Sequence, residues 1–329
     1  MAEWLYEAGI GEARAALVED RTILEARIEL DSPVAPRIGA ILPARLVEIT
    51  VKGREGRVAY EGGEAMLSPL PPGITQGAAL TVELIREAIP EPGRQKLPRA
   101  APAEAGTPPR DGPTLLERIT ATGTPVRPCL PHQPDAFESA GWSEVLEEAL
   151  TGDITFAGPP NVLAGGALRM SPTPAMTLFD VDGHPPLEPL ALAAAHAVAA
   201  AIVRLDIGGS IGVDFPTLQG KAARAAVDAA IDAGLFEGGA QPFERTAMNG
   251  FGFVQIVRRR TRVSLPELLR ADPAAAEARA LLRRIERTPP PIPATHTVGA
   301  RVAKALHANP HWIAELARRT GVAPVFEVR

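Results

Sequence analysis

Cysteine is nearly absent from this chain, which has Cys129 as its one cysteine in 329 residues. A single cysteine excludes an internal disulfide and any Cys-x-x-Cys metal clip, and it is typical of a protein of the reducing cytoplasm. Aromatic residues are also few, at 4% of the chain, whereas there are 34 prolines and 30 glycines. We therefore expect aliphatic cores joined by long turns and linkers.

Signals for secretion or membrane insertion are missing as well. The first residues, Met1–Trp4, begin neither a basic nor an apolar stretch, so we expect no signal peptide. The most apolar run, Leu190–Val203, is about 14 residues long and contains His196. It is shorter than the roughly 20 residues that cross a bilayer. We expect a cytoplasmic protein without a membrane partner.

Charge is unevenly distributed along the chain. Residues 258–329 carry 14 Lys and Arg against 6 Asp and Glu, whereas the rest carries 20 against 33. A basic C-terminal region on an acidic body is typical of a protein with a surface for polyanions. The alternative is that these basic residues only keep surface helices soluble.

Short alternating segments dominate the N-terminal third. Residues 3–30 alternate around a turn at 19–22 and predict a β-hairpin. Residues 36–88 contain further short strands between glycine and proline turns, which predict a small closed barrel of the S1/OB type. Residues 90–134 hold 11 prolines and predict a linker, although 114–120 suits a helical turn.

Residues 160–257 have the most regular pattern. The expected elements are an apolar hairpin at 164–168 and 176–179, a helix at about 187–205, a strand at 210–214, a helix at about 217–235 and a strand at 251–257. This βαβαβ order predicts a parallel or mixed sheet flanked by helices. One further helix is expected at about 266–287, followed by a small α+β module.

Two aspartates stand at the polar ends of apolar runs in this region. Asp180 follows Ala175–Phe179, and Asp214 follows Ile211–Val213. In a strand–helix–strand unit the two strands are parallel, so both carboxylates emerge at the edge where open α/β sheets bind ligands. They would repel each other without a cation, and oxygen ligands favour Mg²⁺ or Mn²⁺. The alternative is that both are ordinary strand-end residues facing water.

Three segments around these aspartates resemble the ribonuclease E/G family. They are the glycine-pair hairpin Gly165–Leu168 with Ala175–Asp182, the block Arg204–Phe215, which is similar to the family's RLRDLGGLIVIDF-type sequence, and Phe251–Arg260, which is similar to its FGLLEMSRQR stretch. The resemblance implies an RNase H-like/DNase I-like α/β core with an inserted S1 barrel. It also implies an endoribonuclease that uses Mg²⁺ to cleave single-stranded RNA, leaving 5′-phosphate and 3′-hydroxyl ends.

Site residues follow from the resemblance position by position. It implies that Asp180 and Asp214 bind the metal, while Asp182, where the family has an asparagine, and Asp206 support the site. Candidate RNA contacts are Lys221, Arg224, Arg258, Arg260 and, in the barrel, Tyr60. For Lys221 and Arg224 a solvated helix face is the alternative. His184 is either a proton carrier or an incidental loop histidine.

Departures from the family are substantial. The zinc-link CPxC motif is missing after Arg262, so we expect no structural zinc, and a homo-oligomer would need another interface. The region between barrel and core is short and proline-rich, so a sensor of the RNA 5′ end is missing or rebuilt. Gly250 replaces an arginine. Met66 stands where the barrel would carry a second stacking aromatic.

We therefore divide the chain into five parts. They are an N-terminal hairpin belonging to the core (1–35), the S1/OB-like barrel (36–89), a proline-rich linker or reduced sensor region (90–137), the α/β catalytic core (138–265) and a small basic C-terminal module (266–329).

Two other functions stay open at this point. The first is a non-catalytic RNA-binding or interaction protein on a decayed nuclease scaffold, which the lost zinc link and Gly250 favour. The second is a haloacid-dehalogenase-like phosphatase, because Phe179–Gly183 resembles the DxDG motif of that family.

Overall fold

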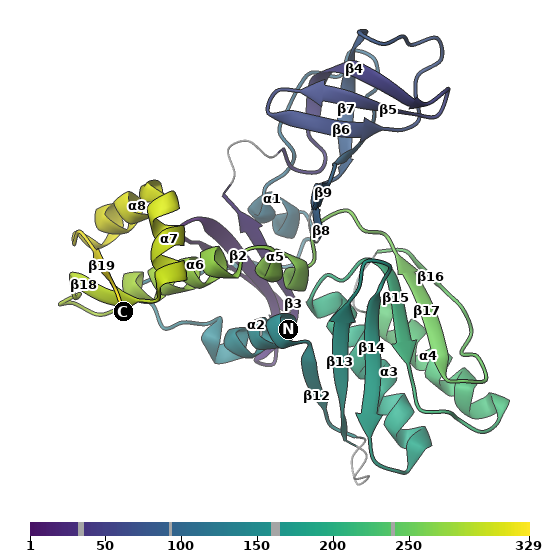
Figure 1. The fold of residues 1–329 in the computed structure, drawn as a ribbon. Coiled ribbons are helices and arrows are strands. Elements are labelled where there is room, and N and C mark those ends of the chain that lie inside the picture. The colour runs from purple at the N-terminus through teal and green to yellow at the C-terminus, as the bar shows by residue number, and fades with distance from the viewer. Residues whose placement is uncertain (32–35, 92–93, 159–164, 238–240) are drawn as a thin grey trace. The chain divides into compact units, whose positions relative to one another are not determined.

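The computed structural model of the chain describes residues 1–31, 36–91, 94–158, 165–237 and 241–329 (Figure 1). The fold is mixed α/β, with several sheets and one closed barrel. Contacts divide the chain into two units. Unit 1 comprises Met1–Asp31, Leu115–Glu144 and Leu268–Arg329, and unit 2 comprises Ser32–Thr114 and Val145–Glu267. Residue 164, expected at the start of the apolar hairpin, lies outside the described residues.

Five short strands of unit 2 form the closed barrel. They are β4 (Ile41–Val51), β5 (Glu55–Tyr60), β6 (Gly63–Leu67), β7 (Ala79–Arg86) and β10 (Arg99–Pro102). Leu46, Val58 and Leu84 are fully buried in its core. The predicted small closed barrel is confirmed, but its last strand comes from residues assigned to the linker. The short hairpin of β8 (Ile89–Glu91) and β9 (Arg94–Lys96) precedes β10, which closes the barrel by pairing with both β6 and β7.

The rest of unit 2 is a six-stranded sheet. Its order is β12 (Asp153–Phe156), β13 (Gly166–Pro172), β14 (Thr177–Gly183), β15 (Gly209–Asp214), β17 (Phe253–Arg258) and β16 (Phe243–Arg245). Neighbours β14 and β15 are parallel and the other described pairs are antiparallel, so the sheet is mixed. Helices α3 (Leu187–Arg204) and α4 (Lys221–Glu237) lie on one of its faces (Figure 1).

Alternation along the strands explains why one face is covered and the other is not. Met170, Phe179, Val213 and Val254 are direct neighbours on β13, β14, β15 and β17, and each is at most 2% exposed. These side chains share the face of α3, since Gly183, on the same face of β14, lies against Leu190 of that helix. The residues between them point to the opposite face of the sheet, which we call the open face.

Helix α3 has the length and apolar composition of a membrane span. Half of its 18-residue apolar window is buried inside the protein. Residues such as Leu190, Val198 and Ile202 supply that buried face. This buried face packs against the sheet and α4, as expected for a core helix.

Unit 1 combines segments from both ends of the chain. Its elements are the sheet β11 (Val126–Pro128), β1 (Glu3–Ala8), β2 (Glu12–Glu19) and β3 (Thr22–Leu30), the helices α1 (Leu115–Thr120), α6 (Pro273–Glu286), α7 (Ala300–Ala308) and α8 (Pro310–Thr320), and the two-stranded sheet of β18 (Thr295–Val298) and β19 (Val325–Val328). Ile10, in the β1–β2 turn, joins Leu282, Leu306 and Trp312 in one apolar cluster. The N-terminal strands therefore share a core with the C-terminal helices, whereas the sequence analysis assigned them to the catalytic core.

Two helices stand where the sequence pattern predicts one. Helix α5 (Leu265–Ala271) ends before Asp272, and α6 starts at Pro273. The Asp272 carboxylate accepts a hydrogen bond of 2.9 Å from the Ala275 backbone N–H. This carboxylate caps the helix, and Pro273 lacks the N–H that continuation of α5 would require.

Replacing Asp272 by alanine should lower the stability of unit 1 by about 1 kcal/mol, because the first turn of α6 then loses its cap. The matched control is Asp272→Asn, which keeps a side-chain acceptor and should cost only a fraction of that. Urea unfolding followed by tryptophan fluorescence measures this difference, since Trp4, Trp142 and Trp312 all belong to unit 1. Equal losses in the two variants would contradict the capping role.

Candidate functional site

Asp180 and Asp214 are direct neighbours on adjacent parallel strands of unit 2. Asp180 of β14 pairs in register with Asp214 of β15. Both are exposed, and both point to the open face, because the residues preceding them, Phe179 and Val213, are buried beneath the helices. Neighbouring strands are about 4.8 Å apart, so the two carboxylates can reach one ion between them. The sequence analysis placed the pair at one sheet edge, and the structure gives its register.

A backbone hydrogen bond holds the chain directly after Asp214, where it leaves β15. The Phe215 backbone N–H donates to the Gly252 carbonyl at 3.1 Å. Gly252 has a φ of +94°, and a Cβ there would lie 2.2 Å from the Phe215 carbonyl oxygen. Only glycine fits this approach. The Asn249 side chain also accepts from the backbone N–H groups of Phe251 and Phe253, which holds the turn before β17.

An apolar patch borders the pair on the open face. Phe253 is the register partner of Asp214 on β17. A Cβ at Gly212 would lie 2.7 Å from the Phe253 ring and 2.8 Å from Leu178. Both side chains therefore cover Gly212, which explains a glycine inside β15. Phe251, in the preceding turn, is 84% exposed.

Arg169 lies on the other side of the pair and was missed by the sequence analysis. On β13 it is the register partner of Asp180, and Asp153 of β12 is its partner in turn. An ion pair of 3.2 Å joins Arg169 and Asp153, whose side chains are 68% and 58% exposed. The available signal was period-2 alternation, which places Arg169 between the buried Leu168 and Met170.

Four other residues weighed in the sequence analysis come at or after the same ends of β14 and β15 along the chain. Asp182 follows two residues after Asp180 on the same face and is exposed. Lys221 is the first residue of α4, directly after the loop that leaves Asp214, and it is exposed. Arg224 is half-buried and donates a hydrogen bond of 3.0 Å to the Leu218 carbonyl in that loop. The exposed His184 directly follows β14.

Asp206, Arg258 and Arg260 are not brought to the pair. Asp206 precedes β15, at the strand end opposite Asp214, and forms an ion pair of 3.4 Å with the buried Arg258. Arg258 also donates to the Ile207 carbonyl at 3.0 Å and shares the helix-covered face with Ile256. Arg260 pairs with Glu267 beside Gly208. These contacts give the three residues structural roles at that strand end.

Tyr60, the barrel candidate, stands at the end of β5. Its ring packs partly on the barrel core, and its hydroxyl oxygen lies 3.0 Å from where a Cβ of Gly63 would be. Burial raises the pKa of the Tyr60 hydroxyl. Part of the Tyr60 side chain is therefore used for packing.

A metal ion on the open face would have two carboxylates, Asp180 and Asp214, as its protein ligands. Among the residues that the structure describes, no group of three or more His, Cys, Asp or Glu side chains could hold an ion. Mg²⁺ is commonly held by one or two carboxylates, with water and substrate phosphate completing its coordination. The donor set of Asp180 and Asp214 fits that requirement.

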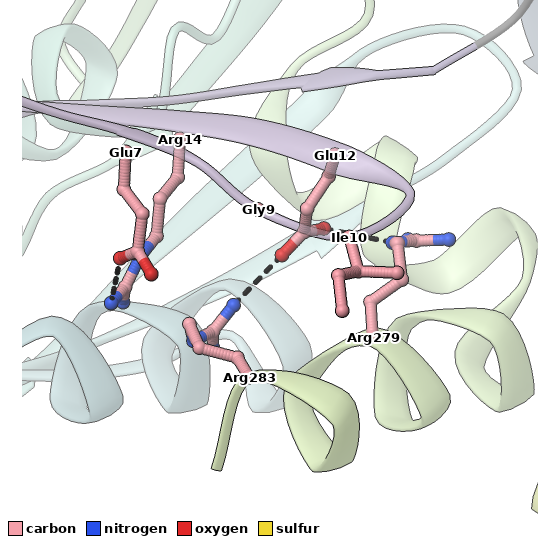
Figure 2. Close-up of a pocket in the computed structure, with 7 residues that line it drawn as sticks. All are labelled: Glu7, Gly9, Ile10, Glu12, Arg14, Arg279 and Arg283. Atoms are coloured by element: carbon pink, nitrogen blue, oxygen red, sulfur yellow. Dashed lines mark hydrogen bonds and ion pairs between the residues drawn. The ribbon is translucent and has the colours of Figure 1, made fainter. Parts of the chain in front are cut away.

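A second polar cluster lies in unit 1 and includes two of the basic C-terminal residues. Arg279 and Arg283, on successive turns of α6, each bond the Glu12 carboxylate at 2.8 Å, as Figure 2 shows. Arg14 bonds Glu7 at 2.8 Å beside them. All five side chains are at most 10% exposed. Part of the predicted polyanion-binding charge is thus neutralised inside unit 1.

Burial shapes the chemistry of this cluster. It lowers the pKa of Arg283, an effect that the nearby Arg14 adds to and Glu12 opposes. Because each charge has an opposite partner, the cluster has the character of a structural ion-pair network.

No protein-family model matches this chain, and no curated protein matches its sequence.

Proposed function

We propose that this protein is a cytoplasmic, Mg²⁺-dependent endoribonuclease of the ribonuclease E/G type that cleaves single-stranded RNA to 5′-phosphate and 3′-hydroxyl ends. The observation that carries the proposal is the in-register pair of exposed carboxylates, Asp180 and Asp214, on adjacent parallel strands. Like charges placed directly opposite each other destabilise a sheet. A function that places a cation between them accounts for this arrangement.

The residues around the pair suit a phosphodiester substrate. A bound Mg²⁺ would polarise the phosphate and lower the pKa of a bound water. Asp180 and Asp214 would hold the ion, and Asp182 lies along the same strand to accept hydrogen bonds from its water. Lys221 offers positive charge in the next element after Asp214. In this proposal Asp206, Arg258 and Arg260 do not contact the substrate. Their ion pairs stabilise the end of β15 opposite Asp214.

The barrel supports an oligonucleotide substrate. Its strand order, β4-β5-β6-β10-β7 with β6 and β10 parallel, is compatible with the five-stranded Greek-key barrel of the OB type. The second and third strands of such barrels bind oligonucleotides. Here these are β5 and β6, which carry Tyr60 and Met66. With one aromatic on these strands, the barrel should contribute modestly to RNA affinity.

Removing the metal is expected to abolish cleavage. An unstructured RNA labelled at its 5′ end should be cut by the purified protein in Mg²⁺ or Mn²⁺ and left intact in excess EDTA. Activity should return when Mg²⁺ is added back. The new ends should accept ligation as 5′-phosphates, which distinguishes the protein from contaminating metal-independent ribonucleases that leave 3′-phosphates.

Two other results would redirect the assignment. RNA binding without cleavage in any divalent metal would favour the non-catalytic scaffold. The presence of both aspartates speaks against that alternative, because a scaffold without catalysis does not need them. Rapid hydrolysis of a generic phosphomonoester, with no RNA cleavage, would favour the haloacid-dehalogenase-like reading of Asp180 and Asp182.

A further inference from the structure

We propose that Arg169 is an RNA-contacting residue of this site, whose guanidinium binds the phosphate that a Mg²⁺ ion on Asp180 and Asp214 would hold. The inference rests on the proposed function and adds a residue that the resemblance did not supply. The observations that carry it are the position of Arg169, its availability in an exposed and weak ion pair, and its positive charge.

Position is the first observation. Asp153, Arg169, Asp180, Asp214 and Phe253 form one row across five strands, each residue the register partner of the next. Side chains in such a row share a face. Arg169 is therefore one strand, or about 4.8 Å of backbone spacing, from the carboxylate pair. The length of its side chain lets the guanidinium reach a phosphate that an ion on the pair would bind.

Availability is the second observation. The ion pair with Asp153 joins two groups that are 68% and 58% exposed. Such exposed pairs contribute about 0–1 kcal/mol to stability, so the protein loses little when Arg169 changes partner. The guanidinium has five N–H donors in a planar fork, which suits the paired oxygens of a phosphate.

Charge is the third observation. Within the transverse row, Arg169 is the single basic side chain among three carboxylates. Asp180 and Asp214 neutralise a divalent cation, but a phosphodiester adds a further negative charge. A guanidinium beside the pair compensates that charge, and it does so most when charge builds on the phosphate oxygens in the transition state. Asp153 would release Arg169 as the phosphate takes its place.

The experiment compares Arg169→Gln with Arg301→Gln. Arg301 is the matched control, because it is also 68% exposed and ion-paired, to Glu277 at 2.7 Å, but lies on α7 of unit 1. Arg169→Gln should lower kcat/KM for RNA cleavage by about 10²-fold, the usual loss for one transition-state donor. Arg169→Lys should recover part of the rate, since lysine keeps the charge without the fork. Arg301→Gln should match the wild type.

Asp153→Asn separates an RNA contact from a structural ion pair. If Arg169 acts only by pairing with Asp153, both substitutions remove the same interaction and should reduce cleavage equally. If Arg169 binds phosphate, Asp153→Asn frees the guanidinium and should leave kcat/KM unchanged or higher. Equal losses in the two variants would overturn the inference.

A binding measurement tests Arg169 independently of catalysis. With Ca²⁺ replacing Mg²⁺ and both aspartates kept, the affinity of the wild type and of Arg169→Gln for the same RNA is measured against salt concentration. Loss of one phosphate contact should reduce the slope of log K against log[salt] by about 0.7. A protein that binds without cleaving but shows this reduction would retain the Arg169 contact and lose the nuclease assignment. Normal cleavage with no effect of Arg169→Gln would keep the nuclease assignment and overturn the Arg169 contact. Absence of RNA binding would overturn both the assignment and the contact.

Discussion

Asp180→Asn and Asp214→Asn are each expected to reduce RNA cleavage by about 10²–10³-fold at saturating Mg²⁺. The reason is that the two carboxylates stand in register on one face, and in the proposed function they share a single ion. Losing one ligand removes several kcal/mol of charge stabilisation at the phosphate, and each 1.4 kcal/mol is tenfold in rate. Cleavage of a labelled unstructured RNA, with kcat and KM determined separately, measures the loss. Variants that cut at the wild-type rate would contradict the assignment of this site.

The stability of the same two variants in the absence of metal is a second, independent measurement. Two carboxylates facing each other on adjacent strands repel, so in EDTA each substitution should stabilise unit 2 slightly, by about 0.2–1 kcal/mol. Mg²⁺ should raise the melting temperature of the wild type, because an ion that binds only the native state stabilises it, and should do little for the variants. A variant that loses both its activity and its native stability would be misfolded, and its lost activity would then say nothing about metal binding.

Asp182→Asn is the matched control for these variants. Asp182 is exposed on the same strand, two residues beyond Asp180, where the resembling family carries asparagine. An amide keeps the hydrogen-bonding oxygen while removing the charge. We expect this variant to retain most of the activity, so a loss as large as that of Asp180→Asn would mean that Asp182 is itself a metal ligand.

The carboxylate pair was predictable because its elements are local and regular. Apolar runs ending at Asp180 and Asp214 flank a long alanine-rich helix, and this pattern requires two parallel strands. The partner on the other side, Arg169, belongs to a strand that returns antiparallel. Its neighbours in sequence show only that it alternates with buried residues. The pairing that places it beside Asp180 depends on register, which a short hairpin leaves open.

Features that depend on distant partners could not be predicted. The barrel strand β10 is four residues long and reads as part of a proline-rich linker, and only its pairing with β6 and β7 makes it a strand. Arg279 and Arg283 read as a solvated helix face, yet both bond Glu12, more than 260 positions away. Charge patterning alone does not separate exposed arginines from paired, buried ones.

Arg14→Met is expected to destabilise unit 1 by about 3–5 kcal/mol, the usual cost of breaking a buried ion pair from one side. Arg14 is 1% exposed and bonds Glu7, which is 2% exposed, at 2.8 Å. Its guanidinium also lies 4.0 Å from the centre of the Phe137 ring. Methionine fills much of the space but leaves Glu7 with Arg287 as its remaining cationic partner, at 3.0 Å.

Urea unfolding followed by tryptophan fluorescence reports this loss, because all three tryptophans belong to unit 1. Arg318→Met is the control, since Arg318 is 70% exposed in its ion pair with Glu315 and should cost less than about 1 kcal/mol. Adding Glu7→Gln to Arg14→Met should recover part of the stability, because the buried carboxylate that has lost Arg14 is then uncharged. If Arg14→Met alone unfolds no more easily than Arg318→Met, the network is not what holds β1 and β2 together. A double variant less stable than Arg14→Met would show that the charged Glu7 still stabilises unit 1 through its ion pair with Arg287.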